Sequence, residues 1–136
     1  MPAETVGEVM HKGAVTCAPS TSLEEAVRIL SDSDVTALVV VGNAGEVLGI
    51  LSHMDVLRHY GEKLAERQVG EIMNPGVLSV QPDTPIPAAI AIILNGHVHR
   101  LVVTTPSPNG AIPVGVVSTA DIIRHLRGAR WAWKWQ

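Results

Sequence analysis

The sequence predicts an α+β fold of the α/β type, in which two β-α-β-β-α repeats with pseudo-two-fold symmetry form one compact module. Three observations predict it. The pentapeptide VGEVM at residues 6–10 recurs as VGEIM at residues 69–73. Each copy is followed by the same succession of apolar stretches and turn residues. Hydrophobic residues make up 46% of the chain and charged residues 17%, so we expect a packed core rather than disorder.

The internal repeat extends over most of the 136 residues. About two aligned positions in five are identical, more than shared composition would produce. The length suits a single domain, so we expect two related halves that share one core. These halves are residues 1–67 and residues 68–128, followed by a tail at residues 129–136. Aligned pairs include Gly13 with Gly76, Pro19 with Pro82, Gly49 with Gly115, Asp55 with Asp121 and Arg58 with Arg124.

Each repeat is expected to begin with a short strand and a helix. The strands are predicted at residues 14–17 and 77–80, apolar stretches that end before a proline and a cluster of Ser, Thr and Asp. Apolar residues then recur at the spacing of one helical face. In the two copies these residues are Leu23, Ala26, Val27 and Leu30, and Ile86, Ala89, Ile90 and Ile93.

The starts of these helices carry capping signals. In the first copy, Ser22 with Glu25, or Thr21 with Glu24, has the spacing of a capping box. In the second copy, Thr84 is followed by a proline, which suits a capping residue with proline at the first helical position.

A hairpin and a last helix complete each repeat. The strands of the hairpins are rich in β-branched residues and nearly all apolar rather than alternating, so we expect both faces of each sheet to be covered. The last helices are expected at residues 54–60 and 120–126. The hairpin strands are predicted at residues 38–41, 47–51, 101–105 and 114–117.

Composition and charge exclude several classes of protein. A net charge of −3 argues against nucleic acid as the main partner. The single Cys17 forms no internal disulfide, and no apolar run is long enough to span a bilayer. Glu4 and Glu8 interrupt any signal-peptide pattern near the start of the chain. We therefore expect a cytoplasmic protein that does not bind membranes.

The closing motifs of the two repeats are the most specific feature. They read GILSHMD at residues 49–55 and GVVSTAD at residues 115–121. Together with the VGE[VI]M openings and the proline before each first helix, they resemble the marks of a cystathionine-β-synthase (CBS) domain pair. The resemblance covers about residues 5–127. It implies a module that binds adenosine-containing ligands in clefts between the two repeats.

The Ser-x-x-Asp motifs allow two interpretations. Ser52 and Ser118 each stand where a strand passes into a helix, so each is expected to cap that helix, with Asp55 or Asp121 in the first turn. Spacing alone favours this purely structural interpretation. A helix N-terminus also suits an anionic ligand, and a carboxylate there can accept hydrogen bonds from a ribose diol. The resemblance favours this second interpretation and implies that the two aspartates bind ribose.

The resemblance also implies positions for the base and the phosphates. The repeats differ where Ala37 aligns with Arg100, so we expect two unequal clefts, with the one at Arg100 better suited to an anion. For Arg58 and Arg124 the alternative is a solvated helix face near a C-terminus. The implied phosphate partners are Arg58, His59, Arg100, Arg124 and His125, and the implied base-binding residues are Thr16, Thr36, Ala37, Leu38, Ser79, His99 and Leu101.

Neither a metal centre nor a catalytic site is predicted. His97 and His99 alternate before a strand, but no Cys pair or His-Glu-x-x-His pattern accompanies them. Cys17 lies in an apolar strand and is expected to be a small buried residue rather than a nucleophile. The residues Ser52, His53 and Asp55 are adjacent in sequence and do not make a catalytic triad. We therefore expect no enzyme and no required cofactor.

The predicted function is a non-catalytic regulatory or sensor module that binds AMP, ADP, ATP or S-adenosylmethionine. The resemblance implies a homodimer, which would act through an unidentified protein partner. The alternative is a structural dimerisation module that binds no ligand. Trp131, Trp133 and Trp135 give the tail a large aromatic area, which either folds back on the protein or forms an interface, and we favour the interface.

Overall fold

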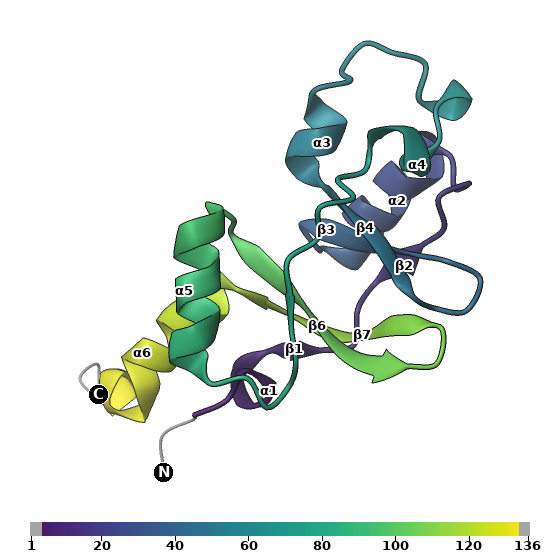
Figure 1. Ribbon diagram of the computed structural model, residues 1–136. Coiled ribbons are helices and arrows are strands. Elements are labelled where there is room, and N and C mark those ends of the chain that lie inside the picture. The colour runs from purple at the N-terminus through teal and green to yellow at the C-terminus, as the bar shows by residue number, and fades with distance from the viewer. Residues whose placement is uncertain (1–3, 134–136) are drawn as a thin grey trace. The chain divides into compact units, whose positions relative to one another are not determined.

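The computed structural model describes residues 4–133, without the side chains of residues 129–133. The chain is a mixed α and β protein with two sheets, and each repeat has the predicted order β-α-β-β-α (Figure 1). The fold class is therefore confirmed. The chain divides into two compact units. The first comprises the chain up to Gly13, residues 78–105 and the chain from Val114, and the second comprises residues 14–77 and 106–113.

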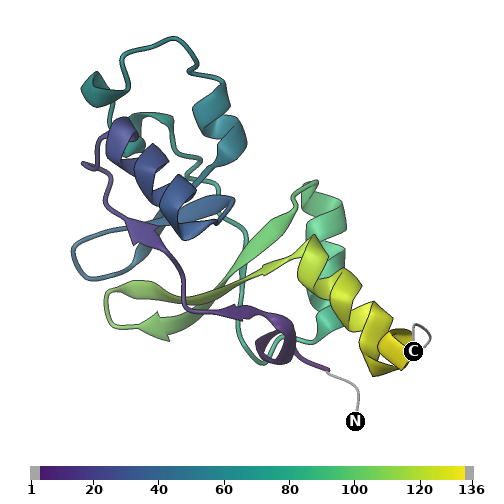
Figure 2. The same cartoon turned by 180° about the vertical axis from the view of Figure 1, so that it is seen from behind.

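The second unit contains a three-stranded sheet with the order β2-β3-β4. β2 pairs with β3 in parallel and β3 pairs with β4 in antiparallel fashion. Helix α2 packs against β3 (Figure 2). The elements are β2 (Thr16–Cys17), α2 (Leu23–Ser33), β3 (Ala37–Val41), β4 (Val47–Ser52), α3 (His53–Leu57), the 3-10 helix η1 (Leu64–Glu66) and α4 (Val69–Ile72).

The first unit is built on a four-stranded sheet with the order β1-β7-β6-β5. β6 and β7 form a long hairpin, β1 pairs with β7 in antiparallel fashion, and β5 pairs with β6 in parallel (Figure 1). The elements are α1 (Val6–Val9), β1 (His11–Lys12), β5 (Ser79–Val80), α5 (Ile86–Gly96), β6 (Arg100–Ser107), β7 (Gly110–Ser118) and α6 (Thr119–Trp133), which a non-helical Gly128 interrupts.

The opening segment of each repeat packs on the sheet that the other repeat builds. Helix α1 donates from Gly7 N to the carbonyl oxygen of Pro82 at 2.8 Å, and α4 donates from Gly70 N to the carbonyl oxygen of Pro19 at 2.8 Å. A Cβ atom on Gly7 would lie 3.0 Å from that oxygen of Pro82. The glycine of the VGE motif therefore permits a close backbone contact. The compact units consequently cross the boundaries of the sequence repeats.

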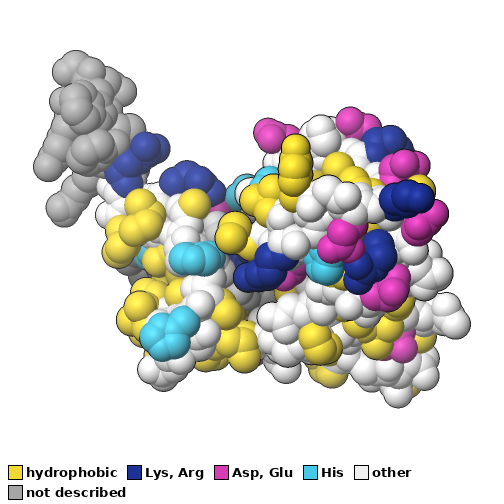
Figure 3. Space-filling view, turned by 90° about the horizontal axis from the view of Figure 1, so that it is seen from above, with side chains coloured by type: hydrophobic (Ala, Val, Ile, Leu, Met, Phe, Trp, Pro, Cys, Tyr) yellow, Lys and Arg dark blue, Asp and Glu magenta, His cyan; other side chains and the backbone are white. Residues whose placement is uncertain are grey.

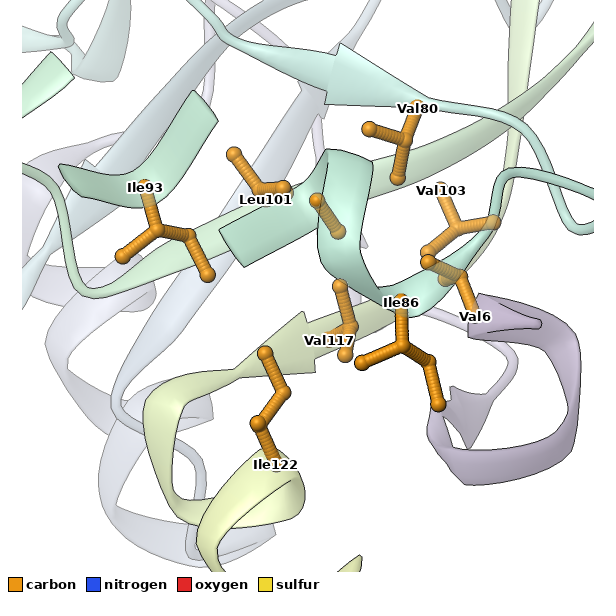
Figure 4. Packing of buried hydrophobic residues seen from close by; sticks show 9 residues of the cluster. Val6, Val80, Ile86, Ile93, Leu101, Val103, Val117 and Ile122 are labelled. Atoms are coloured by element: carbon orange, nitrogen blue, oxygen red, sulfur yellow. The ribbon is translucent and has the colours of Figure 1, made fainter. Parts of the chain in front are cut away.

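Each of the two compact units has its own cluster of buried hydrophobic residues. Each sheet packs with the helices of its own unit, and these helices supply enough apolar side chains to bury one face. Figure 4 shows the cluster of the first unit. Its buried residues are Val6, Val80, Ile86, Ala89, Ile93, Leu101, Val103, Val117 and Ile122. Those of the second unit are Cys17, Leu23, Ala26, Leu30, Leu38, Val40, Leu51 and Val69.

The expectation that both faces of the sheets are covered holds for only part of the hairpins. Consecutive residues are buried in β3, at 38–40, and in β6, at 101–104. In β4 and β7, buried residues alternate with partly exposed ones, and Leu48 is exposed. These two strands thus follow the period of two that is typical of a half-covered strand.

The helix starts agree with the capping signals in part. Ser22 caps α2, because its Oγ accepts a hydrogen bond from Glu25 N at 3.1 Å, as predicted. Thr84 does not cap α5, since Pro85 holds that position and the helix begins one residue later than expected. Thr84 Oγ1 instead accepts from Gln81 N, as Thr21 Oγ1 accepts from Ala18 N. In both repeats the threonine closes the turn before the helix.

The last helices differ from their expected lengths. α3 ends at Leu57, whereas α6 extends beyond residue 126. Predictions about the tryptophan tail concern side chains that lie outside the described part of the chain. Within residues 4–133, no helix is both long and apolar enough to cross a membrane.

Candidate functional site

The first Ser-x-x-Asp motif joins β4 to α3. Ser52 caps the helix as predicted, and its backbone N–H donates to Asp55 Oδ2 at 2.8 Å. Ser52 Oγ lies 3.0 Å from the same carboxylate oxygen and 3.4 Å from Asp55 N. This reciprocal arrangement holds the carboxylate in one orientation at the helix start. The structural interpretation of the motif is therefore confirmed in the first repeat.

The second motif repeats this geometry between β7 and α6. The backbone N–H of Ser118 donates to Asp121 Oδ2 at 2.8 Å, and Asp121 N donates to Ser118 Oγ at 3.2 Å. The side chain of Asp121 is 2% exposed, compared with 14% for Asp55. A buried carboxylate needs hydrogen bonds to its oxygens. Asp121 depends on such partners more than Asp55 does.

The second oxygen of each carboxylate binds an arginine three residues further along the helix. Arg58 Nη1 lies 3.0 Å from Asp55 Oδ1, and Arg124 Nη2 donates to Asp121 Oδ1. His11 Nδ1, from β1, also lies 3.0 Å from Asp121 Oδ1. Sequence reasoning missed His11. The sequence does contain one signal for it: His11 directly follows the opening motif of the first repeat, and the residue at the same place in the second repeat is Asn74.

The base-binding positions predicted for the first repeat lie near its motif in the second unit. The backbone N–H of His53, the first residue of α3, donates to the carbonyl oxygen of Thr36 at 3.1 Å. Thr36 precedes Ala37 at the start of β3, and the neighbouring β2 places Thr16 opposite Val39. The start of β3 and the start of α3 are therefore held together.

The corresponding positions of the second repeat have the same arrangement in the first unit. The backbone N–H of Thr119 donates to the carbonyl oxygen of His99 at 2.9 Å. His99 is exposed and precedes the partly buried Arg100 at the start of β6, and Ser79 on β5 pairs with Val102. The structure thus brings Ser79, His99 and Arg100 into the same unit as the second motif.

Two of the predicted base-binding side chains point into the cores. Leu38 and Leu101 are both 0% exposed, each in the hydrophobic cluster of its unit. The side chain of Leu38 packs with residues of α2, and that of Leu101 packs with residues of α5, so neither faces solvent. Any contact between these residues and a ligand would use their backbone groups.

Most of the predicted phosphate partners are engaged with acidic side chains. Arg58 and Arg124 bind the aspartates of their own motifs. His59 Nδ1 lies 2.7 Å from Glu62 Oε2, and this contact lowers the pKa of the Glu62 carboxyl. Acidic and basic side chains intermingle over the second unit (Figure 3). A phosphate would have to compete with these carboxylates for the cations.

The described residues contain no evident reactive centre. Within residues 4–133, no group of three or more His, Cys, Asp or Glu is placed to hold a metal ion. His97 ends α5 in a left-handed conformation with φ of 52°, and His99 is exposed. Burial raises the pKa of the Cys17 thiol to about 11, which keeps it protonated and weakly nucleophilic at neutral pH. Cys17 is the small buried residue that the sequence predicts.

The chemistry that this arrangement supports is binding. Each carboxylate is held at a helix start by its serine, so its orientation is set before any ligand arrives. A ribose diol has two hydroxyl donors that match a carboxylate acceptor. Reorientation of flexible groups costs affinity, and a carboxylate that is already oriented avoids that cost.

Both repeats match the model of a known family, and two curated proteins are similar to this chain over part of their own length. The model of the CBS domain family matches residues 6–62 and 69–128. An A-adding tRNA nucleotidyltransferase from Geobacter sulfurreducens is 31% identical over 125 residues, which cover 92% of this chain and 14% of that enzyme. The gamma-3 subunit of 5'-AMP-activated protein kinase from Sus scrofa is 34% identical over 110 residues, which cover 74% of this chain and 21% of the subunit. The chain therefore spans only a small part of these relatives.

Solved structures with the same fold cover nearly the whole chain. The CBS domain pair of protein MJ0100, in complex with 5'-methylthioadenosine and S-adenosyl-L-methionine, has a TM-score of 0.82 at 23% identity and covers 93% of this chain and 98% of its own. CBSX2 in complex with AMP has a TM-score of 0.79 at 25% identity and covers 94% of this chain and 99% of its own.

Proposed function

Because the chain belongs to the CBS domain family, we propose that it is a non-catalytic regulatory module that binds AMP, ADP, ATP or S-adenosylmethionine. One observation carries the proposal: both repeats keep a Ser-x-x-Asp motif whose carboxylate is oriented at a helix start. Asp55 and Asp121 would accept hydrogen bonds from the ribose hydroxyls.

The ligands of similar proteins support this choice. CBSX2 binds AMP, and the domain pair of MJ0100 binds S-adenosyl-L-methionine and 5'-methylthioadenosine. The kinase whose gamma-3 subunit resembles this chain is named for its activation by 5'-AMP. Adenosine is the part that these ligands share. We therefore propose that the ligand contains adenosine, and the ligand panel described below identifies the group on its 5' carbon.

The remaining predicted residues would contact either the base or the anionic group of the ligand, according to their positions. Thr16, Thr36 and Ala37 in the first repeat, and Ser79 and His99 in the second, would contact the base. Arg100 would favour a ligand that carries a phosphate or carboxylate, because a guanidinium binds such groups with two parallel hydrogen bonds. Its counterpart in the first repeat is Ala37. The second repeat would therefore bind the more anionic ligand.

Regulation would follow from linkage. A ligand that prefers one conformation of the module increases the population of that conformation, and a protein partner senses the change. We include a homodimer in the proposal, since two-fold dimers are the commonest assemblies among soluble oligomers. The mass of the protein in solution, measured with and without AMP, tests this part.

Thermal unfolding with a panel of ligands tests the proposal directly. A ligand at about 100 times its dissociation constant should stabilise the native state by about 2.7 kcal/mol. We expect a rise in melting temperature with at least one of AMP, ADP, ATP and S-adenosylmethionine, and its loss in the double variant Asp55→Asn, Asp121→Asn. Inosine monophosphate serves as the control for the base. A panel that leaves the melting temperature unchanged contradicts the proposal.

A second candidate function, dimerisation without a ligand, rests on exposed apolar side chains. On α6, Ile123 and Leu126 are 62% and 70% exposed, and on α5 Leu94 is 67% exposed. In the other repeat Leu57 on α3 is 60% exposed. Exposed apolar side chains of this size are the groups that an interface between two chains would bury. A stable dimer that binds none of the panel would favour this function.

A further inference from the structure

His11 makes a contact that joins the opening segment of the chain to the second Ser-x-x-Asp motif. Its Nδ1 lies 3.0 Å from Asp121 Oδ1. The imidazole is 72% exposed, whereas the carboxylate side chain beneath it is 2% exposed. β1 pairs with β7 and places His11 opposite Val116, close to the start of α6. The exposed imidazole therefore covers a buried carboxylate.

The oxygens of Asp121 have no acceptor position to spare. Oδ2 accepts from the backbone N–H of Ser118 and contacts Ser118 Oγ at 3.1 Å. Oδ1 contacts both Arg124 Nη2 and His11 Nδ1. An ionised carboxylate has about four lone-pair sites, and these contacts occupy all of them. A ligand hydroxyl can bind Asp121 only if one of the present partners leaves.

The first repeat lacks this extra partner. Asn74 takes the place of His11, and its backbone bonds with Ile50 in both directions at 2.9 Å. The side-chain oxygen of Asn74 accepts from Gly76 N at 2.9 Å. Within residues 4–133, Oδ1 of Asp55 has Arg58 as its one hydrogen-bond partner. The two motifs thus differ in one contact: an opening segment supplies the His11 side chain to Asp121 and supplies no equivalent side chain to Asp55 within residues 4–133.

We propose that His11 controls access to Asp121: the ribose hydroxyls of an adenosine ligand bind this carboxylate only after the imidazole has left it. The inference rests on the proposed function and deepens it. His11 acts through Asp121 and is therefore a positioning residue. A protonated imidazole binds a carboxylate more strongly than a neutral one, and histidine changes charge between about pH 5 and 8. Ligand binding at Asp121 therefore weakens as the pH falls.

The charged groups around His11 leave this direction unchanged. Arg124 on α6 shares Asp121 Oδ1, and Lys12 is the neighbour of His11 on β1. Arginine and lysine side chains keep their charge over the range in which histidine titrates. On α1, hydrogen bonds from Glu4 and Thr5 lower the pKa of Glu8, which also interacts with His125 on α6. Histidine is the residue type whose charge changes in that range, and the histidines on these elements are His11 and His125.

Calorimetric titration with 5'-methylthioadenosine tests the proposal. This probe carries the ribose diol and has no phosphate whose own titration would disturb the pH dependence. The full chain with Asp55→Asn reports on the second motif, and His11→Asn is added to it because asparagine is the residue at the equivalent position. We expect His11→Asn to tighten binding about fivefold at pH 7. In the chain that carries Asp55→Asn alone, the affinity should fall about fivefold from pH 8 to pH 6. In the chain that also carries His11→Asn, this fall should disappear.

The matched control is Asp121→Asn, which reports on the first motif, where His11→Asn should change neither the affinity nor its pH dependence. Binding that is identical with and without His11→Asn in the Asp55→Asn chain overturns the inference alone. A pH dependence that persists in the His11→Asn chain assigns the effect to His125 and also overturns it. If neither the variants nor the unsubstituted chain binds 5'-methylthioadenosine, this inference is overturned, and the proposed function is overturned as well if the panel of AMP, ADP, ATP and S-adenosylmethionine also leaves the melting temperature unchanged. Melting curves confirm that each variant is folded.

Discussion

The glycine of the second closing motif is expected to be indispensable because the opening segment lies directly against it. A Cβ atom on Gly115 would lie 2.5 Å from the carbonyl oxygen of His11 and 2.8 Å from Met10 Sδ. The oxygen belongs to the backbone of β1, which pairs with β7 at this point, so it cannot rotate away like a side-chain end. Gly115→Ala therefore has to push β1 away from β7.

The cost follows from the two contacts. Overpacking in a well-packed region costs about 1–3 kcal/mol. Weakening the backbone hydrogen bonds between the opening segment and β7, such as that from Gly13 N to the carbonyl oxygen of Val114 at 2.8 Å, adds about 1 kcal/mol for each bond lost. We expect Gly115→Ala to lower the free energy of unfolding by about 2–4 kcal/mol.

Urea denaturation followed by circular dichroism measures this change. The equivalent Gly49→Ala should cost less, because the nearest atom to its Cβ is Met73 Sδ at 2.7 Å, in a flexible side chain, and the backbone oxygen of Asn74 is 2.9 Å away. Gly76→Ala is the control and should stay within about 0.5 kcal/mol, since only a side-chain oxygen lies near, at 3.3 Å. A Gly115→Ala protein as stable as the Gly76→Ala protein would refute the reasoning.

Two further outcomes are expected. Val6→Ala and Val69→Ala should each lower the free energy of unfolding, measured in urea, by about 2 kcal/mol. Both side chains are 0% exposed and anchor the opening segments in the two cores. Val9→Ala is the control and should lower it less, because Val9 is only partly buried. Cys17, whose pKa is raised to about 11 by burial, carries less thiolate at pH 8 than an unfolded thiol, so iodoacetamide should modify it at least about tenfold more slowly in buffer than in urea. Equal rates in the two solvents would mean that Cys17 is not buried.

Features that depend on neighbours in the chain were predictable from the sequence. Ser22, Ser52 and Ser118 each bind a group three residues further along, so the spacing of residue types was enough to identify them. Thr84 shows the limit of this reasoning. Its hydroxyl closes the preceding turn, and a threonine near a helix start has both options open at similar energy.

The sequence alone also could not show which strand of each hairpin is buried on both faces and which is buried on one face only. β3 and β4 are both apolar, yet β3 is buried at three consecutive residues and β4 alternates. Composition is nearly the same in both strands, and the difference arises from what packs against them. For the same reason the side chains of Leu38 and Leu101, expected near a ligand base, lie in the cores.

The sequence by itself determined the repeat, the fold class, the family and the two Ser-x-x-Asp motifs, because each is expressed in residue types at short, regular spacing. Only the tertiary structure decided that each opening segment packs on the sheet of the other repeat and that His11 covers Asp121. The pairing of β1 with β7 brings those two residues together from opposite ends of the chain. No local pattern records such a contact, since its energy depends on chain segments that meet only after folding.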